Sequence, residues 1–348
     1  MNNKSHILSY SIDELKEKLL CICKKPFVVK QILRWIFVNH TIDFALMSNI
    51  SKELRERLSD EFDYSLPSII DVKVSKDKSK KILLKLHDES LIEMVFMPSD
   101  KKNTLCISSQ VGCSRQCTFC ATGRLGLKRD LKQEELLAQV LIAYGCFKDC
   151  SITNIVLMGM GEPLDNLENV MSFLKVMQAE DGFRFSGRRT TLSTCGIVPK
   201  IYELADSSIK MKLAVSLNSA IDEKRSLIMP VNEMYPLSEL KAALLSFRKK
   251  TNYRITFEYV MIDDFNMGSE DIKALTKFCG DISCKVNLIK WNEVPSLPWK
   301  SPSDKKVEAF IEKLQKLPFA ITYRKSRGVD IAGACGQLAG GVKYEVFF

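Results

Sequence analysis

The chain has 348 residues, of which 46% are hydrophobic, and it carries 51 Lys and Arg against 42 Asp and Glu, a net charge of +9. This length suffices for one large catalytic domain and a smaller one, and the composition is ordinary for a soluble globular protein. No stretch approaches the roughly 20 apolar residues of a membrane-spanning helix, and the first ten residues lack the features of a secretory signal. We therefore expect a cytoplasmic protein without a membrane segment.

The basic residues are unevenly distributed along the chain. Residues 1–100 carry 16 Lys and Arg against 15 Asp and Glu, which leaves 35 against 27 for the other 248 residues. A polyanion would bind such a surface with a marked dependence on salt, although charge alone is equally typical of a solvated lysine-rich surface. The basic side chains concentrate at Lys101–Lys102, Arg115, Arg124, Lys128–Arg129, Arg184–Arg189 and Arg324–Arg327.

Residues 1–68 are predicted to form a small helical domain. Ser11 can cap a first helix, and SIDELKEKLL, KQILRWIFVNH and SKELRERLSDEF place apolar side chains at helical spacing. Lys24, Lys25, Lys30 and Arg34 are candidates for phosphate contacts, with a solvated helix face as the plainer interpretation. From residue 69 the apolar pattern alternates, and IIDVKVS, KKILLKL and SLIEMVFMP predict three short strands. We interpret residues 69–102 as a β-meander linker.

Residues 103–348 are predicted to form the catalytic domain. Candidate strands are TLCISS, NIVLMGM, RTTLSTC, KLAVSLN, RITFEYVMI, KVNLIKW and AITYRK, and amphipathic segments lie near 131–147, 166–179, 198–206, 237–250, 269–279 and 303–316. This alternation predicts parallel βαβ units whose strands are buried on both faces. The fold class is therefore α/β, a full or partial (β/α) barrel with functional residues at the carboxyl ends of its strands.

Three cysteines lie within eight residues of the predicted catalytic domain. Cys113, Cys117 and Cys120 form a C-x3-C-x2-C run followed by Ala-Thr-Gly. Such close thiols favour a soft metal or an iron–sulfur cluster, whereas a closed zinc site needs a fourth ligand. A zinc site that borrows Cys146 or Cys150 is the alternative. The twelve cysteines of the chain have irregular spacing, which fits a reducing cytoplasm better than a disulfide framework.

This cysteine triad resembles the signature of radical S-adenosylmethionine (SAM) enzymes. The resemblance implies a [4Fe–4S] cluster held by the three thiolates, with SAM on the fourth iron, and reductive cleavage of SAM to a 5′-deoxyadenosyl radical. The segment Gly159-Met-Gly-Glu-Pro163 matches the SAM-binding segment of that superfamily, so we assign Gly161 and Glu162 to SAM. Further candidates for SAM contacts at the ends of later strands are Ser193, Ser216, Leu217, Asn218 and Asn292.

Two further cysteines indicate which family within this superfamily the chain resembles. Cys106 lies on the strand before the triad, and Cys335 lies in the glycine-rich stretch GVDIAGACGQLAGG. A lone cysteine in an apolar strand is usually a small buried hydrophobe, but one in so flexible a stretch is less easily explained by packing.

Together these segments resemble the RlmN/Cfr family of ribosomal RNA adenine methyltransferases. The resemblance covers essentially the whole chain and includes KQILRWIF, IEMVFMP, TLCISSQVGC, GMGEPLDN, RRTTLSTCGIVP, FEYVMI, NLIKWN and DIAGACGQLAG. GMGEPLDN and AGACGQLAG are closer to the RlmN type, which methylates carbon 2 of adenosine 2503 in 23S rRNA and, in many members, adenosine 37 of tRNA. The Cfr type methylates carbon 8. One departure is Asn218, where the family often has His.

The resemblance implies a reaction that consumes two SAM molecules. Cys335 takes a methyl group from the first SAM as a thiolate nucleophile. The radical from the second SAM removes a hydrogen from that methyl group, and the resulting carbon radical adds to the adenine. Cys106 then attacks the sulfur of Cys335, which releases methylated RNA and leaves a transient Cys106–Cys335 disulfide. Glu93 matches the family's proposed proton acceptor, with an exposed strand carboxylate as the alternative.

The resemblance also implies the partners. These are 23S rRNA, tRNA, a flavodoxin or ferredoxin that supplies electrons, and an accessory domain over residues 1–68 that binds RNA, in a monomeric protein. Three alternatives stay open: a Cfr-type carbon-8 methyltransferase, a non-catalytic RNA-binding protein with a structural or redox-sensing metal site, and a peptide-modifying radical SAM enzyme. The last gives no reason for the Cys106 and Cys335 pair.

Overall fold

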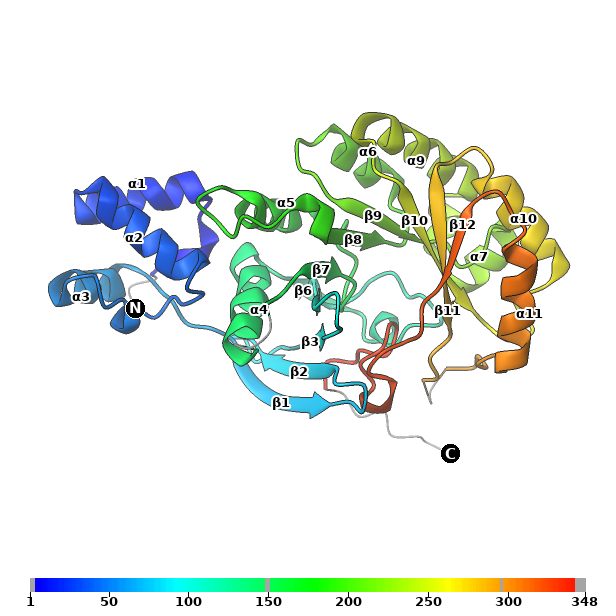
Figure 1. Cartoon of the computed structure of the whole chain (residues 1–348), viewed down its shortest axis with the longest axis horizontal. Coiled ribbons are helices and arrows are strands. Elements are labelled where there is room, and N and C mark those ends of the chain that lie inside the picture. The colour runs from blue at the N-terminus through cyan, green and yellow to red at the C-terminus, as the bar shows by residue number, and fades with distance from the viewer. Residues whose placement is uncertain (1–3, 148–150, 295–296, 342–348) are drawn as a thin grey trace.

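The N-terminal domain consists of three α-helices packed beside a large curved sheet (Figure 1). The computed structural model describes residues 4–147, 151–294 and 297–341. The helices α1 (Ile12–Cys23), α2 (Pro26–Phe37) and α3 (Lys52–Glu61) match the predicted ones. Ser11 accepts a hydrogen bond from the backbone N–H of Glu14, whose carboxylate accepts one from the N–H of Ser11, so the predicted cap is a complete capping box.

The described strands form one sheet of ten and a separate hairpin. The large sheet has the order β1-β2-β3-β4-β7-β8-β9-β10-β11-β12. Its strands are β1 (Ser68–Val74), β2 (Lys80–Lys85), β3 (Leu91–Met97), β4 (Thr104–Ile107), β7 (Asn154–Leu157), β8 (Thr190–Thr194), β9 (Lys212–Ser216), β10 (Ile255–Met261), β11 (Cys284–Lys290) and β12 (Ala320–Tyr323). The pairs from β1 to β4 are antiparallel, and those from β4 to β12 are parallel. All predicted strands are therefore confirmed.

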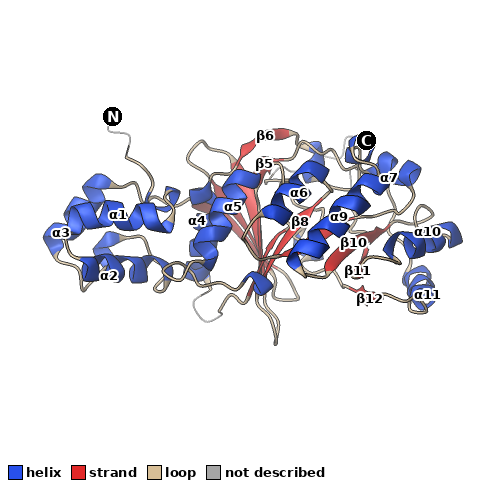
Figure 2. Ribbon diagram, turned by 90° about the horizontal axis from the view of Figure 1, so that it is seen from above, coloured by secondary structure: helices blue, strands red, loops and turns tan. Residues whose placement is uncertain are grey.

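The helices of the catalytic part cover the outer side of this sheet (Figure 2). They are α4 (Gln133–Cys146), α5 (Leu167–Gln178), α6 (Val198–Asp206), α7 (Asp222–Ile228), α8 (Val231–Met234), α9 (Leu237–Thr251), α10 (Ser269–Cys279) and α11 (Asp304–Leu314). The short helices α7 and α8 were not predicted. The prediction that α4 is amphipathic is wrong, because nearly every side chain from Gln133 to Ala143 is buried. One end of α4 is covered by the N-terminal domain, where Gln133 donates to the carbonyls of Leu8 and Tyr10.

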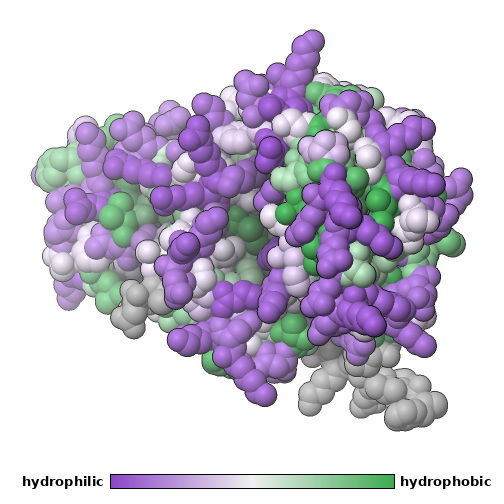
Figure 3. Space-filling model, turned by 45° about the vertical axis from the view of Figure 1, so that its right-hand side comes forward, coloured by the Kyte–Doolittle hydropathy of each residue, from purple (hydrophilic) through white to green (hydrophobic). Residues whose placement is uncertain are grey.

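The sheet is an open partial barrel with β1 and β12 at its two ends, which confirms the predicted fold class. The expectation that the parallel strands are buried on both faces is confirmed for β10, where every residue but Val260 is buried, and is wrong for β7, β8 and β11, where alternate residues are half-buried. On β11, Lys285 and Asn287 are half-buried, whereas the alternate residues Val286 and Leu288 are fully buried under the helices. The interior of a partial barrel is not filled by its own side chains, so these positions reach solvent. Figure 3 shows a hollow with an apolar interior and a hydrophilic rim on one face of the molecule.

The predicted β-meander continues the catalytic sheet. Val95 of β3 pairs with Cys106 of β4, so β1 to β3 extend the parallel strands at one end. The ranges 1–68, 69–102 and 103–348 stay a prediction of domain organisation. No helix among the described residues has the length and apolar character needed to cross a bilayer.

Candidate active site

A cavity opens at the carboxyl ends of the parallel strands, where the sequence predicts the functional residues. It is lined by loops that follow β7, β8, β9 and β11, by the loop that carries the cysteine triad, and by the C-terminal segment. Ten of the predicted site residues line this cavity: Cys113, Cys117, Cys120, Gly161, Glu162, Ser193, Ser216, Asn218, Asn292 and Cys335. Glu93, Cys106 and Leu217 do not belong to its lining.

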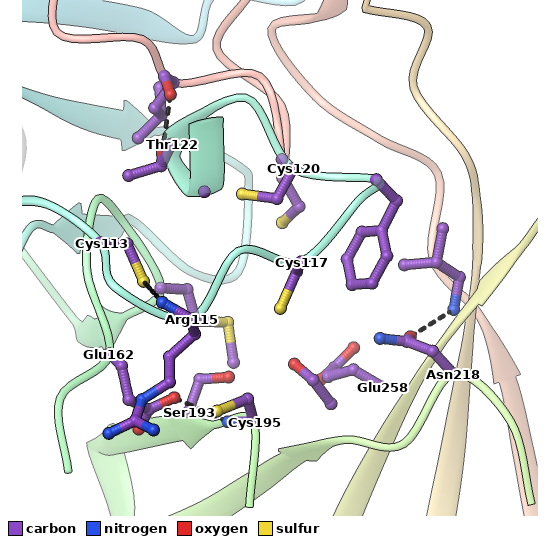
Figure 4. Close-up of a pocket in the computed structure, with 18 of the residues that line it drawn as sticks. Cys113, Arg115, Cys117, Cys120, Thr122, Glu162, Ser193, Cys195, Asn218 and Glu258 are labelled. Atoms are coloured by element: carbon purple, nitrogen blue, oxygen red, sulfur yellow. Dashed lines mark hydrogen bonds between the residues drawn. The ribbon is translucent and has the colours of Figure 1, made fainter. Parts of the chain in front are cut away.

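The three triad thiols face this common cavity (Figure 4). Burial raises the pKa of the Cys113 thiol to about 12, and burial also raises the pKa values of Cys117 and Cys120. Thiolates at such sites need a bound cation, which iron supplies. No three His, Cys, Asp or Glu side chains among the described residues converge on a single-metal site. Three thiols that line one cavity are a donor set that suits an iron–sulfur cluster. Of the candidate zinc ligands, Cys146 is exposed at the end of α4 and Cys150 lies outside the described residues.

The triad loop is attached to the predicted SAM segment by side chains that the sequence did not single out. The guanidinium of Arg115 donates through two nitrogens to the carboxylate of Asp165, three residues after Glu162. The loop lies between the strands of a hairpin, β5 (Gln110–Gly112) and β6 (Leu127–Asp130), that was not predicted. Gln110 accepts a hydrogen bond from the N–H of Glu162 at 2.8 Å. The cysteines and the glycine motif therefore form one connected unit.

Gly161 has to be glycine because the backbone passes very close to Gln110. Its φ is +103°, and an added Cβ would lie 2.6 Å from the Cβ of Gln110. Glu162 is 4% exposed, and its two oxygens accept hydrogen bonds from the N–H groups of Leu164 and Cys195 at 3.0 and 2.7 Å. Burial raises the pKa of this carboxyl. The remaining lone pairs of Glu162 face the cavity, where an ammonium group would be a suitable partner.

Asn218 and Leu217 have mainly structural contacts. Asn218 adopts a left-handed backbone with φ of +57°, which asparagine tolerates well. Its side-chain oxygen accepts a hydrogen bond from the N–H of Val260 at 3.0 Å, and its amide nitrogen donates to the sulfur of Met229. Leu217 is fully buried, and its carbonyl accepts from the guanidinium of Arg225. The assignments of Asn218 and Leu217 to SAM stay predictions.

The C-terminal segment is hydrogen-bonded directly to the triad loop. The N–H of Ala121 donates to the carbonyl of Gly336 at 2.7 Å, and the hydroxyl of Thr122 donates to the carbonyl of Leu338 at 2.7 Å. Asn292 donates to the carbonyl of Cys335 at 3.1 Å, so the side chain predicted to contact SAM also positions this cysteine. The exposed thiol of Cys335 therefore lies at the wall of the cavity that the triad lines.

The β-meander anchors the other side of the same segment. Glu93 is only 3% exposed, so the alternative interpretation of Glu93 as an exposed carboxylate on a strand is excluded. One of its oxygens pairs with Lys81 at 2.8 Å, and the other accepts from the N–H groups of Ala339 and Gly340 at 2.8 and 3.1 Å. Lys81 also donates to the carbonyl of Ala332. This geometry gives Glu93 a positioning role, and its role as a proton acceptor stays a prediction.

Cys335 also lines a second, smaller cavity, whose wall contains Cys106. Cys106 is buried, and this burial, with a contribution from Cys335, raises the pKa of its thiol to about 12. The guanidinium of Arg324 lines both cavities and acts electrostatically on both thiols, lowering the pKa of Cys106. Both cysteines are free thiols in this structure. Cys335 is thus the one cysteine, among the described residues, that lines both the triad cavity and the Cys106 cavity.

Sequence reasoning missed several residues of the site. Glu258 lines the main cavity and is 7% exposed; Asn287 donates to one of its oxygens at 3.0 Å, and the other has no hydrogen-bond partner among the described residues. Burial raises the pKa of this carboxyl. The one feature of the sequence that could have pointed to Glu258 is that it is an acidic residue inside the otherwise apolar strand RITFEYVMI. Arg225 is fully buried and donates to the carbonyls of Cys195 and Ser216. No sequence signal marked it, since α7 was not predicted.

Two family models match the chain. Residues 107–279 match the Radical SAM superfamily, and residues 5–63 match the ribosomal RNA large subunit methyltransferase N-terminal domain. The first range contains the triad and the glycine motif, and the second contains the three N-terminal helices.

Similar proteins cover nearly the full length of the chain. A protein of Clostridium perfringens named probable dual-specificity RNA methyltransferase RlmN is 42% identical over 96% of this chain and 96% of its own length. A protein of Geobacter sulfurreducens named dual-specificity RNA methyltransferase RlmN is 41% identical over 98% of this chain and 93% of its own. The crystal structure of a radical SAM methyltransferase from Sphaerobacter thermophilus superposes with a TM-score of 0.93 at 36% identity, covering 97% of this chain and 99% of that one.

Proposed function

Because this chain belongs to the RlmN family of radical SAM RNA methyltransferases, which use a [4Fe–4S] cluster and SAM, we propose that it methylates carbon 2 of adenosine 2503 in 23S rRNA and adenosine 37 in tRNA. The names of the relatives, as RNA methyltransferases, favour an enzyme over a non-catalytic RNA-binding protein. Substrate identity and the ring carbon are the parts of this proposal that need an experiment.

In this proposal Cys113, Cys117 and Cys120 hold the cluster, and Gly161 and Glu162 hold SAM. When bound, these cofactors supply one-electron cleavage of SAM beside the cavity wall that carries Cys335. Glu162 is fixed by two backbone N–H groups and accepts the ammonium of SAM. Ser193 and Ser216, which line the same cavity, offer hydroxyl groups for the rest of the molecule.

Cys335 is proposed to carry the methyl group. As a thiolate it forms a carbon–sulfur bond with the methyl group of one SAM, which leaves as S-adenosylhomocysteine. After removal of one hydrogen atom, the sulfur-bound carbon radical would add to carbon 2 of the adenine, and the adduct would return one electron to the cluster and lose the carbon-2 proton to a base. The thiolate of Cys106 would then attack the sulfur of Cys335, so that a disulfide forms while the carbon–sulfur bond breaks with its electron pair on carbon, which takes up a proton to become the methyl group. The cationic side chain of Arg324 lowers the pKa of Cys106 and so favours its thiolate form.

The observation that carries this proposal is the position of Cys335 between the two cavities. The triad lines one cavity, Cys106 lines the other, and the thiol of Cys335 belongs to both linings. The smaller cavity has a volume of only about 20 Å³, so it is a space between the two cysteines rather than a site for a base. A single thiol can therefore take a methyl group from the side of the triad cavity and be attacked by Cys106 from the other side.

The proposal is tested by mass spectrometry of 23S rRNA and tRNA from cells with and without this protein. We expect carbon-2 methyladenosine at position 2503 of the rRNA and at position 37 of tRNAs only when the protein is present. Methylation at carbon 8 would assign the chain to the Cfr type of reaction. Unmodified RNA in both strains would refute the proposal. We further propose that the protein acts as a cytoplasmic monomer that receives electrons from a flavodoxin or ferredoxin.

A further inference from the structure

Cations gather at the edge of the parallel sheet opposite the active site. Lys212 is the first residue of β9, Arg254 immediately precedes β10, and Lys285 is the second residue of β11. In the parallel ladder, Ala214 pairs with Thr256 and Thr256 pairs with Lys285, so these cations lie at neighbouring strand starts. Lys102 precedes β4 by two residues at the same edge. Parallel strands bring their starts together, which turns residues far apart in sequence into one cluster.

These cations are close enough to repel one another electrostatically. Burial lowers the pKa of Lys212, and Lys102 and Lys285 lower it further. The pKa of Lys285 is also lowered, first by burial and then by Lys102, Arg324 and Arg254, against an opposing effect of Glu258. Within residues 4–147, 151–294 and 297–341, none of Lys102, Lys212, Arg254 and Lys285 forms an ion pair with a carboxylate. Repulsion of this kind costs stability and is relieved by a bound anion.

A groove beside this edge adds further cations and an aromatic ring. It is lined in part by Arg188, Lys210 and Tyr253. The loop before β8 and the loop before β9 pack so closely that a Cβ on Gly187 would lie 1.9 Å from the carbonyl oxygen of Lys210. Glycine at this position therefore brings Arg188 and Lys210 together. Basic side chains beside an aromatic ring are the usual elements of a surface that holds single-stranded nucleic acid, because phosphates bind the cations and bases stack on the ring.

The loop that lines this groove also contacts the N-terminal helical domain. The loop before β8 contains Asp181, which pairs with Lys16 of α1 at 2.7 Å, and Phe183, whose ring packs on Phe37 of α2 at 5.2 Å between centroids. Lys30 of α2 also acts electrostatically on Asp181. The helical domain thus packs against the same loop that carries Arg188.

The concave face connects this edge to the reacting cysteine. Lys285 and Asn287 of β11 are half-buried on that face, and Ile289, two residues further along, lines the cavities that contain Cys335. Four residues of strand correspond to about 13 Å at 3.3 Å per residue. A nucleotide extruded from a loop held at the edge has this polar path toward the thiol, as base-modifying enzymes require.

We propose that this strand-start edge is the surface that binds the phosphate backbone of a single-stranded RNA loop, while the target adenine enters along the concave face. The edge consists of Lys102, Arg188, Lys210, Lys212, Arg254 and Lys285. The inference rests on the proposed RNA methyltransferase function. An acidic electron-transfer protein is the less suitable partner, because the triad lies at the other ends of strands whose five to seven residues span about 17–23 Å.

The test uses the variant Lys210→Gln/Lys212→Gln/Arg254→Gln, whose three native side chains are all exposed. The control is Lys273→Gln/Lys277→Gln/Lys305→Gln, which removes the same charge from exposed positions on α10 and α11. Affinity for a hairpin RNA that contains the target adenine is measured from 0.1 to 1 M salt. Three lost phosphate contacts should reduce the logarithmic salt slope by about 2 to 3 and weaken binding roughly a hundredfold at 0.1 M salt, with no such change in the control.

A second variant keeps the proposal falsifiable if the triple variant folds poorly, as judged by thermal unfolding and cluster absorbance. Tyr253→Ala should weaken RNA binding while leaving the salt slope unchanged, because stacking involves no counterion release. An unchanged salt slope in the triple variant, or an equal loss in the control, overturns the proposal. Slower reduction by an acidic flavodoxin with intact RNA binding also overturns it and assigns the edge to the electron donor. Methylation of Cys335 by SAM alone in the wild-type protein tests the proposed function separately.

Discussion

Glu93 offers the sharpest test of how the methyl-carrying segment is held. Its carboxylate pairs with Lys81 at 2.8 Å, and the two side chains are only 3% and 10% exposed. The other oxygen accepts hydrogen bonds from Ala339 and Gly340. In Glu93→Gln the buried ammonium of Lys81 loses its counter-ion, and removal of one partner of such a pair costs about 3–5 kcal/mol. Because both side chains are nearly buried, solvent screens their interaction only weakly, and this cost in stability needs little reduction.

The cost should appear as local release of the C-terminal segment rather than as global unfolding. At 1.4 kcal/mol for each factor of ten, about 3 kcal/mol raises the released population more than a hundredfold. Hydrogen exchange at residues 336–340 should therefore accelerate by about that factor in Glu93→Gln, and methylation of Cys335 should slow. The matched control is Glu89→Gln in the adjoining turn, whose ion pair with Lys85 is largely exposed and contributes at most about 1 kcal/mol.

A double variant separates this anchoring role from proton transfer. Lys81→Met in the Glu93→Gln background removes the stranded charge, so slow hydrogen exchange and Cys335 methylation should both partly return. A catalytic proton acceptor would not be restored by a change at Lys81. Unchanged hydrogen exchange of residues 336–340 in Glu93→Gln would refute the reasoning from the ion pair.

Three further predictions concern the cavity. Ala in place of any one of Cys113, Cys117 and Cys120 should abolish the visible absorbance of a reconstituted cluster that contains about four irons in the native chain; a native iron content near one would indicate a mononuclear site. Gly161→Ala should abolish SAM binding in equilibrium dialysis, because its Cβ meets Gln110, whereas Gly145→Ala, with no neighbour within 4 Å, should bind SAM normally; equal binding by both would contradict the packing argument. Because burial raises the pKa of Cys106 to about 12, release of RNA from the Cys335 adduct should accelerate about tenfold per pH unit between pH 7 and 9 in single-turnover assays, and a flat profile would mean that this thiol is already ionised in the adduct.

Local patterns were sufficient to predict the parallel strands and the longer helices. Helical spacing in SIDELKEKLL and the cap at Ser11 predicted α1 closely, because capping and amphipathic spacing depend only on neighbouring residues. The βαβ alternation similarly predicted the parallel sheet. The half-exposed concave face was not predicted, because Lys285 and Asn287 alternate with Val286 and Leu288 inside a run that reads as nearly apolar.

The site could be predicted only where its functional residues lie close together in the sequence. The triad and the glycine motif are such segments. The placement of Cys335 depended on a family resemblance, because the C-terminal segment that carries it contacts the triad loop more than 200 residues away, as between Thr122 and Leu338. The ion pair of Arg115 with Asp165, the bonds of Arg225 to strand carbonyls, and the buried carboxylate of Glu258 depend on the tertiary fold. No local pattern marks such long-range contacts.

The central claim is that the methyl group travels through the thiol of Cys335 and loses a hydrogen before it reaches the RNA. The most direct measurement supplies SAM with a trideuterated methyl group and determines the mass of the methylated adenine. The account predicts a methyl group that carries two deuterium atoms, because one is removed while the carbon is bound to sulfur. A methyl group that keeps all three would mean direct transfer from SAM and would contradict the account.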